Sequence, residues 1–251
     1  MRRYGLTDRQ WEVISGLLPG RKGHVGATAR DNRLFVEAVL WKYRAGVPWR
    51  DLPERFGDWK NVHRRFSRWA QSGVWDRIFE ALTRDRDNEY LMIDSTIVRA
   101  HQHAAGAKRG AADRQALGRS RGGLSTKIHA LVDALGRVVD IALSPGQAAD
   151  ITAAHGLLDG RRFGGLIADR AYDADHLTQP LRQAGTAVVI PSTRSRRTPI
   201  PHDRDLYKQR NRIERFFCRL KQFRAIATRY DKRADHFAAA TKLAAAILSY
   251  N

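Results

Sequence analysis

The sequence has little of several features that would assign it to a common class. One cysteine, Cys218, occurs in 251 residues, which excludes an internal disulfide and indicates a reducing compartment. No run of about 18 apolar residues is present, and residues 1–4 lead into a predicted helix rather than a secretory signal. A GxxxxGK[ST] phosphate-binding loop is also absent. These absences argue against secreted, membrane-spanning and ATP-driven proteins and predict a cytoplasmic one.

Acidic residues are outnumbered by basic ones. The chain has 45 lysines and arginines against 26 aspartates and glutamates, which gives a net charge of +19. Such an excess suits a polyanionic partner, because clustered cations attract phosphate backbones. A membrane surface could also attract the charge, but no lipid-facing apolar helix accompanies it. The composition therefore favours nucleic acid, and the length allows one or two domains.

The tryptophans mark a separate N-terminal region. All six lie between Trp11 and Trp75, a shift in composition that predicts a small all-α domain over residues 1–84. The charged stretch over residues 83–89 is the expected boundary. A second domain is then expected over residues 88–251.

Residues 58–72 form the most informative predicted helix of the first domain. Apolar residues occupy one face of it. The opposite face carries Lys60, Arg64, Arg65 and Arg68. A helix is also expected over residues 31–45, followed by a short helical piece over residues 49–56 and a turn at Gly57. Helix, glycine turn and cationic helix together are typical of a helix-turn-helix, whose second helix enters a DNA major groove. The alternative is a solvated basic face on a packing domain, and the net charge favours DNA.

The second region alternates predicted strands and helices. Strands are expected over residues 90–98, 124–132, 137–143, 165–169 and 186–190. Helices are expected over residues 147–158, 174–184, 206–225 and 235–249. The glycine-rich, basic segment over residues 101–123 predicts a mobile loop that becomes ordered on DNA.

The predicted helix over residues 206–225 has three distinct faces, whereas an ordinary amphipathic surface helix has two, one apolar and one polar. At about 100° per residue, an apolar arc and a separate polar stripe appear. The stripe carries Tyr207, Arg210, Glu214 and Lys221. Arg210 and Glu214 could be an ordinary i,i+4 ion pair, worth a few tenths of a kcal/mol. The other interpretation is a functional carboxylate held among cations.

Two aspartates on predicted strands complement Glu214. Asp94 lies in the middle of the strand over residues 90–98, where a charge is costly without a partner. Asp169 ends the strand over residues 165–169, although it could instead cap a turn or helix. Three carboxylates would repel one another and protonate unless a divalent metal removed that penalty. Three carboxylates, two on strands and one on a helix, are what a two-metal phosphoryl-transfer site requires.

These motifs resemble those of DDE transposases from bacterial insertion sequences. The spacing Tyr207-x2-Arg210-x3-Glu214-x6-Lys221 matches the signature of that family. The segments Met-Ile-Asp94-Ser-Thr and Ala-Asp169-Arg-Ala-Tyr-Asp resemble its two aspartate motifs. The chain is most similar to the compact transposases of the insertion-sequence-five group, over almost its whole length.

The resemblance implies a fold and a set of partners. The expected fold is α/β, with an RNase H-like mixed five-stranded sheet and flanking helices after the small all-α helix-turn-helix domain, and the element order agrees. The implied partners are the element's terminal inverted repeats and target DNA, with a homodimer or higher oligomer on DNA and no membrane. The implied location is the cytoplasm, at the nucleoid.

The resemblance also implies a reaction. Asp94, Asp169 and Glu214 would be catalytic ligands of Mg²⁺, with Mn²⁺ able to substitute. The enzyme would bind insertion-sequence ends, cleave the phosphodiester and join the 3′-OH to target DNA by two-metal catalysis. The residues expected to contact DNA, from the resemblance or from the basic helix, are Tyr207, Arg210, Lys221, Arg170, Lys127, Lys60, Arg64, Arg65 and Arg68.

Two other functions would use the same residues. A DNA-binding regulator that has lost catalysis would need only the N-terminal helices, although the presence of all three acidic residues argues against it. A metal-dependent nuclease of RNase H-like fold would cut DNA without joining it. The residues alone do not separate that nuclease from a transposase.

Overall fold

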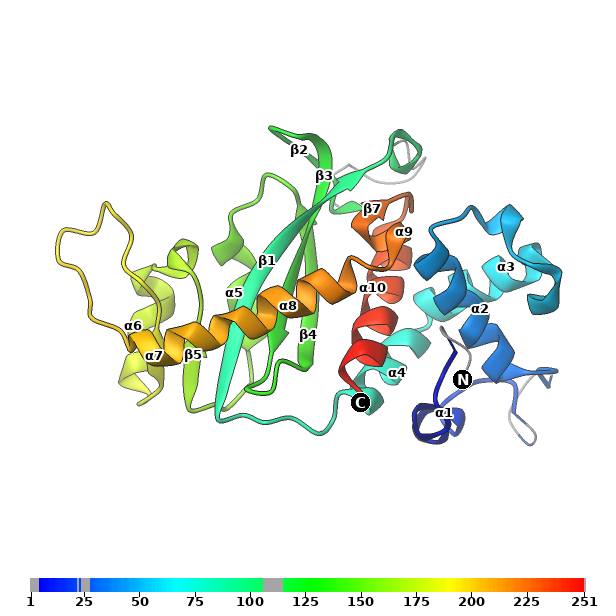
Figure 1. Cartoon of the computed structure of the whole chain (residues 1–251), viewed down its shortest axis with the longest axis horizontal. Coiled ribbons are helices and arrows are strands. Elements are labelled where there is room, and N and C mark those ends of the chain that lie inside the picture. The colour runs from blue at the N-terminus through cyan, green and yellow to red at the C-terminus, as the bar shows by residue number, and fades with distance from the viewer. Residues whose placement is uncertain (1–4, 22, 24–27, 106–114, 251) are drawn as a thin grey trace. The chain divides into compact units, whose positions relative to one another are not determined.

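A computed structural model gives the chain as two compact units (Figure 1). The structure describes residues 5–21, 23, 28–105 and 115–250. Counting only those residues, the first unit takes its members from segments 5–84, 100–105 and 219–250, and the second takes its members from segments 85–99 and 115–218. The first unit thus takes in the C-terminal segment. The compact units do not have the boundaries of the predicted domains over residues 1–84 and 88–251. Whether those two segments fold independently remains a prediction.

Helices make up most of the first unit. Its elements are α1 (Asp8–Ser15), α2 (Asn32–Ala45), η1 (Trp49–Asp51), η2 (Glu54–Phe56), α3 (Trp59–Gln71), α4 (Val74–Leu82), η3 (Gln102–Ala104), α9 (Arg224–Ala227), β7 (Thr228–Arg229) and α10 (Ala234–Ser249), where η denotes a short 3₁₀ turn. The helix predicted over residues 31–45 is confirmed as α2. The side chain of Asp31 caps its start, and Gly46 ends it in the left-handed conformation that glycine adopts readily.

The last helix of the chain packs inside this first unit. Helix α10 lies against α4 and α3, and its many alanines allow the helices to approach closely. Polar contacts fix its register: Lys242 Nζ pairs with Asp76 at 2.7 Å, and His236 Nε2 lies 3.0 Å from Ser67 Oγ. The alanine-rich pattern predicts this helix but gives no indication of its partners. Across the described ranges, no helix combines the length and apolar character needed to cross a membrane.

The second unit contains a sheet and its covering helices. Its strands are β1 (Tyr90–Ala100), β2 (Gly118–Ser120), β3 (Gly123–Val132), β4 (Val138–Pro145), β5 (Gly165–Ile167) and β6 (Ala187–Val189). Its helices and turns are η5 (Asp150–Ala153), α5 (Ala154–Leu158), η6 (Arg170–Tyr172), α6 (Asp175–Gln183), α7 (Arg204–Tyr207), η7 (Lys208–Arg210) and α8 (Asn211–Leu220).

The strand order determines which residues can meet. β1 pairs with β3, and β3 with β4, in antiparallel fashion, whereas β1 with β5 and β5 with β6 are parallel pairs. The resulting order β4-β3-β1-β5-β6 places the first and fourth predicted strands side by side, as expected for an RNase H-like sheet. The mixed α/β architecture with flanking helices is confirmed. The short β2, which pairs with the start of β3, is an addition that the sequence does not predict.

The two faces of this sheet differ. Successive residues of a strand point to opposite faces, so Leu91 and Ile93 of β1 lie on one face, and Met92 and Asp94 lie on the other. Leu91 and Ile93 belong to a buried core that includes residues of α5 and α6. That core also contains Leu131, Val139, Leu157, Leu158, Leu166, Tyr172 and Leu177. Asp94 therefore lies on the face away from the apolar core.

The helix predicted over residues 206–225 is shorter than expected. The elements α7, η7 and α8 form one helical run that ends at Leu220. It ends because the amides of Gln222 and Phe223 bond back only three residues, which closes a turn before α9. Lys221 consequently lies beyond the helix. The apolar period continues to Phe223, so the sequence pattern contains no signal for this stop.

The predicted mobile loop over residues 101–123 falls partly outside the described residues, since residues 106–114 are not described. Its described parts contain η3 and β2. Ala116 and Leu117 are buried, which the small and basic composition of the loop does not predict. The described flanks of the loop are therefore packed.

A buried histidine lies on β3. His129 is opposite Ser95 of β1, and its Nε2 is 2.7 Å from Ser144 Oγ. Its Nδ1 is buried with no hydrogen-bond partner among the described residues. Burial lowers the pKa of His129 to about 4, with Asp150 opposing the shift and Lys127 adding to it. The neutral ring is therefore the folded form.

We expect acid to destabilise the protein through His129. A histidine whose folded-state pKa lies below its unfolded value stabilises the fold fully above about pH 6.5. That contribution is lost as the pH falls toward about 4. The free energy of unfolding in urea should therefore fall with pH across this window, and by less in His129→Gln, which gains no proton. An equal fall in both proteins would contradict the assignment.

Candidate active site

The sheet brings two of the predicted aspartates together. β1 and β5 are parallel, with Met92 opposite Ile167. Continuing that register by two residues brings Asp169, which follows β5 and caps η6, level with Asp94. A two-residue step keeps a side chain on the same face, so both carboxylates lie on the face away from α5 and α6. Their charges act on each other, since Asp169 contributes to the raised pKa of Asp94.

Arg210 connects this face of the sheet to the helix that carries Glu214. Its Nη2 donates to Asp94 Oδ2 at 2.7 Å, and its Nη1 donates to Glu214 Oε1 at 2.5 Å. The Asp94 side chain is 13% exposed and that of Glu214 is 51% exposed. The i,i+4 pair considered from the sequence exists, but the same guanidinium also reaches β1. An ordinary surface ion pair does not describe this arrangement.

The carboxylates around Arg210 affect the pKa values of one another and of Arg210. Burial raises the pKa of Asp94, Arg210 and the Ser95 amide oppose that rise, and Asp169 and Asp150 add to it. For Arg210, burial disfavours the charge but the neighbouring carboxylates outweigh it, so the pKa of Arg210 lies above its ordinary value. The Nε of Arg210 is buried and has no hydrogen-bond partner in the described part of the chain. One guanidinium thus serves several carboxylates.

A fourth carboxylate, Asp150, supports this part of β1, and sequence reasoning misses it. From η5, it accepts a hydrogen bond from Ser95 Oγ at 2.5 Å and pairs with Lys127 Nζ at 2.8 Å. Because Ser95 follows Asp94, this contact fixes the strand beside the candidate ligand. An acidic residue in a predicted helix is normally solvated, so no local signal marks Asp150.

Lys127, which is predicted to contact DNA, already has partners within the sheet unit. Its side chain is mostly buried, and besides its pair with Asp150 the ammonium donates to the Ala148 carbonyl at 2.6 Å. The reason is its position on β3, on the same face as His129 and Ser95, where the residues of η5 cover it. Lys127 therefore stabilises Asp150 rather than presenting a free charge.

Tyr172 is a second residue that sequence reasoning leaves without a role. It lies on η6, directly after Asp169 and Arg170, and is fully buried. Its hydroxyl has no hydrogen-bond partner among the described residues. Burial raises its pKa, and Asp150, Asp94 and Asp169 add to the rise. The phenol is therefore neutral, and its ring belongs to the apolar core with Leu91 and Ile93, on the opposite face of the sheet from Asp94.

Of the other residues predicted to contact phosphates, only some lie in the same compact unit as the carboxylates. Tyr207 is half-buried at the end of α7, with its ring centroid 5.5 Å from that of His202. Arg170 is exposed on η6. Lys221 belongs to the first compact unit, whereas the carboxylates belong to the second. Of the four residues of the predicted stripe, Tyr207, Arg210 and Glu214 therefore lie in one compact unit, and Lys221 lies in the other.

The donor set suits a hard divalent cation. Mg²⁺ prefers carboxylate oxygens, and Asp94, Asp169 and Glu214 supply such oxygens around Arg210. Among the described residues, no three or more His, Cys, Asp or Glu side chains are arranged to hold a metal, and the Arg210 guanidinium lies between two of these carboxylates. The oxygens of these carboxylates are of the kind that Mg²⁺ prefers, and their charge favours a nearby cation. Arg210 supplies that cation in this structure.

The basic helix predicted over residues 58–72 is confirmed as α3, which the Asp58 side chain caps. Its buried side carries Val62, Phe66 and Trp69. The exposed side carries Lys60, Arg64 and Arg68. The short helical piece predicted over residues 49–56, before Gly57, is present as the two 3₁₀ turns η1 and η2. DNA recognition by this helix stays a prediction.

Arg65 does not belong to the exposed face that the helical wheel gives it. Its guanidinium carbon lies 4.2 Å from the ring centroid of Phe35 and 4.6 Å from that of Trp69. It also donates to the Asn32 side chain. Burial lowers the pKa of Arg65 to about 10, and Arg68 adds to the shift. Arg65 thus packs within the helical unit, because the aromatic rings of α2 and α3 offer its flat cation a partner.

Two family models match the chain over adjoining regions. One, described as "Putative transposase of IS4/5 family", matches residues 6–79. The other, described as "Transposase DDE domain", matches residues 86–249 and so includes Asp94, Asp169 and Glu214. The second match alone covers more than half of the chain.

Individual relatives agree with these models. A Sinorhizobium fredii protein named "Uncharacterized protein y4sN" is 58% identical over 106 residues, which cover 42% of this chain and 84% of the relative. A Brucella ovis protein named "Putative transposase for insertion sequence element IS6501" is 39% identical over 127 residues, which cover 50% of this chain and 98% of the relative.

A solved piggyBac transposase, in a synaptic complex with hairpin DNA, matches 79% of this chain and 51% of its own at 15% identity, with a TM-score of 0.40. That likeness is too low to add to the assignment, which stands on the family models and the sequence relatives. Because the DDE domain model spans residues 86–249 and the relatives include named insertion-sequence transposases, the chain belongs to the DDE transposase family of insertion sequences.

Proposed function

We propose that this chain is an active DNA transposase that cleaves the phosphodiester at the ends of its element and joins the freed 3′-OH to target DNA. The observation that carries the proposal is the guanidinium of Arg210, which touches Asp94 and Glu214 at once. A regulator without catalysis would have no need to hold like charges together in a half-buried place. The free-energy cost of that arrangement is typical of a functional site.

Asp94, Asp169 and Glu214 are the residues that would hold the metal, which we propose to be Mg²⁺, with Mn²⁺ as a substitute. When bound, such a metal activates the attacking oxygen and stabilises the leaving oxygen of the phosphodiester. The location we propose is the bacterial cytoplasm, where the DNA lies.

The chain's own residues would orient the DNA strand. Arg210 carries a planar fork that suits two oxygens of one phosphate, and Tyr207 and Lys221 would add a hydroxyl and a compact charge. Asp150 would keep the Asp94 segment in place through Ser95.

Recognition of the element's ends falls to the first compact unit. The exposed cations of α3 would enter the major groove, and two copies of the protein would act together, because transposition joins two ends. The proposed DNA partners are the terminal inverted repeats and a target duplex. A nuclease would share these residues but would release cut ends without joining them.

Neutral replacements of the three carboxylates should abolish the chemistry. We expect Asp94→Asn, Asp169→Asn and Glu214→Gln each to lower strand cleavage by more than the roughly 10–100-fold that losing a partner of a metal ligand costs. Binding to end DNA should stay within about twofold, because it depends on arginines and lysines elsewhere. Strand-resolved gels of end DNA with and without magnesium measure cleavage and joining separately.

Two exposed carboxylates of the same unit provide matched controls. Asp159→Asn and Glu89→Gln change the same net charge on exposed side chains and should cut at the parental rate. If any one of the three candidate ligands tolerates its amide with near-parental cleavage, that residue is not a ligand. Cleavage without any joined product would favour the nuclease.

Arg210 should compete with the metal. In Arg210→Gln the carboxylates lose their resident cation, so the metal-free protein should unfold at lower temperature. Mn²⁺ should then bind about tenfold more tightly than to the parent, roughly 1.4 kcal/mol of added stabilisation at saturating metal. Thermal unfolding over a Mn²⁺ titration measures this, with Arg215→Gln on the exposed side of α8 as the control. An unchanged or weaker response to Mn²⁺ would show that Arg210 and metal do not compete.

The exposed cations of α3 should determine binding to the ends. In the full chain, Arg64→Ala and Arg68→Ala should each weaken binding by about 1–3 kcal/mol where they read bases. Where they hold phosphates, they should instead lower the salt dependence. Arg9→Ala, an exposed arginine of α1, serves as the control in the same titrations. Parental affinity and salt dependence in both variants would remove α3 from the DNA interface.

A further inference from the structure

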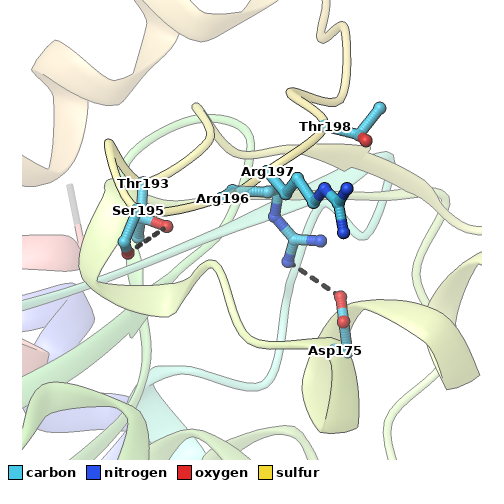
Figure 2. A pocket seen from close by; sticks show the side chains of 6 residues that line it. All are labelled: Asp175, Thr193, Ser195, Arg196, Arg197 and Thr198. Atoms are coloured by element: carbon cyan, nitrogen blue, oxygen red, sulfur yellow. Dashed lines mark hydrogen bonds and ion pairs between the residues drawn. The ribbon is translucent and has the colours of Figure 1, made fainter.

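The second unit has a cavity of about 420 Å³ beside the connection between β6 and α7 (Figure 2). Its lining residues are Asp175, Thr193, Ser195, Arg196, Arg197 and Thr198. None of the three candidate metal ligands lines it. Most of the lining comes from residues 192–200, which we call the 192–200 loop.

The 192–200 loop is tied at its base. The Ile200 amide donates to Ser192 Oγ at 2.8 Å, and this hydroxyl lies 3.5 Å from the Ile200 carbonyl. The Thr193 amide donates to Asp173 Oδ2 at 2.7 Å. These contacts join the two ends of the loop to each other and to the segment after η6. The loop therefore has a defined shape before any ligand arrives.

Arg196 fixes the loop from inside and has its charge neutralised. Its Nε and Nη2 donate to the two oxygens of Asp173 at 2.9 and 2.8 Å, and Nη2 also reaches Asp175 Oδ1 at 2.8 Å. The Asp173 side chain is only 3% exposed, which makes this a firm anchor. Figure 2 shows Arg196 directed toward Asp175. Arg196 is consequently a tether rather than a free cation.

The same loop presents two arginines that have no such role. Arg194 and Arg197 are exposed, and in the described part of the chain no carboxylate pairs with either of them. Arg197 lines the cavity together with Thr193, Ser195 and Thr198, and the Ser195 hydroxyl donates to Thr193 Oγ1 at 3.4 Å. Arg194 lies on the same loop, outside that lining. An ordered loop that offers unpaired guanidinium groups is suited to oxyanions such as phosphate.

The anchor of the loop continues the segment of Asp169. Asp169 caps η6, and Asp173 follows η6 directly. The segment that carries Asp169, a candidate metal ligand, therefore also carries Asp173, which anchors the loop. The loop is joined to that segment by the Asp173–Arg196 pair.

We propose that the 192–200 loop binds the phosphodiester backbone of DNA through Arg194 and Arg197, with Arg196 and Asp173 holding it in shape. The inference rests on the proposed function, since it takes DNA as the polyanion. It adds a backbone contact outside both the carboxylate group and α3. Such a contact is independent of base sequence, because phosphates carry no sequence information.

The test is the salt dependence of DNA binding by the full-length protein. In Arg194→Gln/Arg197→Gln, the slope of log K against log salt concentration should decrease by about 2, since each lost phosphate contact removes about 0.9. The control is Arg162→Gln/Arg182→Gln, which removes two charges from the α5–α6 region of the same unit and should keep the parental slope. Two duplexes are used, one with the element's end and one unrelated.

The two duplexes identify the source of the phosphates. A decrease with the end duplex alone assigns the loop to element DNA, one with the unrelated duplex alone assigns it to target DNA, and one with both assigns it to either backbone. Parental slopes on both duplexes would overturn the inference. The proposed function would survive that result if the end duplex were still cut and joined.

A charge-conserving variant separates electrostatics from a change in loop shape. Arg194→Lys/Arg197→Lys keeps both positive charges, so its slope should return to within about 0.5 of the parental value. If the lysine variant lost as much slope as the glutamine variant while both unfolded at the parental temperature, charge at these positions would not be the cause. The inference would then be wrong.

Discussion

The arrangement of the second unit depends on one guanidinium that contacts two carboxylates. Arg210 reaches Asp94 on the central strand and Glu214 on α8, and so fixes the helical run against one face of the sheet. Asp169 is brought to the same group by the parallel register of β5. Without a cation, these charges would raise one another's pKa and the group would protonate or separate. On the proposed function, the metal would enter beside Asp94 and Glu214, where Arg210 now supplies the positive charge.

Much of this could be predicted from local pattern. Asp94 and Asp169 interrupt or end strongly apolar strands, and an uncompensated charge in such a place is informative because its burial is costly. The stripe of Tyr207, Arg210 and Glu214 follows from helical periodicity alone. The RNase H-like sheet is implied by the family resemblance, and the pairing of β1 with β5 agrees with it.

The parts that sequence reasoning missed depend on partners distant in the chain. Arg65 has the spacing of an exposed residue, yet two aromatic rings draw it inward. Lys127 has the charge of a DNA contact, yet Asp150 neutralises it from η5. The alanine-rich, apolar pattern of α10 predicts a helix, but it does not predict that this helix packs with the N-terminal helices. In each case the tertiary contact, and not the local propensity, decides the role.

The central claim is that Arg210 occupies the carboxylate group in place of a metal. Anomalous diffraction from crystals of the full-length protein soaked in Mn²⁺ tests it most directly, because the signal locates the ion and the map locates the guanidinium. The account predicts Mn²⁺ on oxygens of Asp94 and Asp169, with the Arg210 guanidinium no longer within hydrogen-bond distance of Asp94. Mn²⁺ bound elsewhere, with Arg210 still on both Asp94 and Glu214, would contradict it.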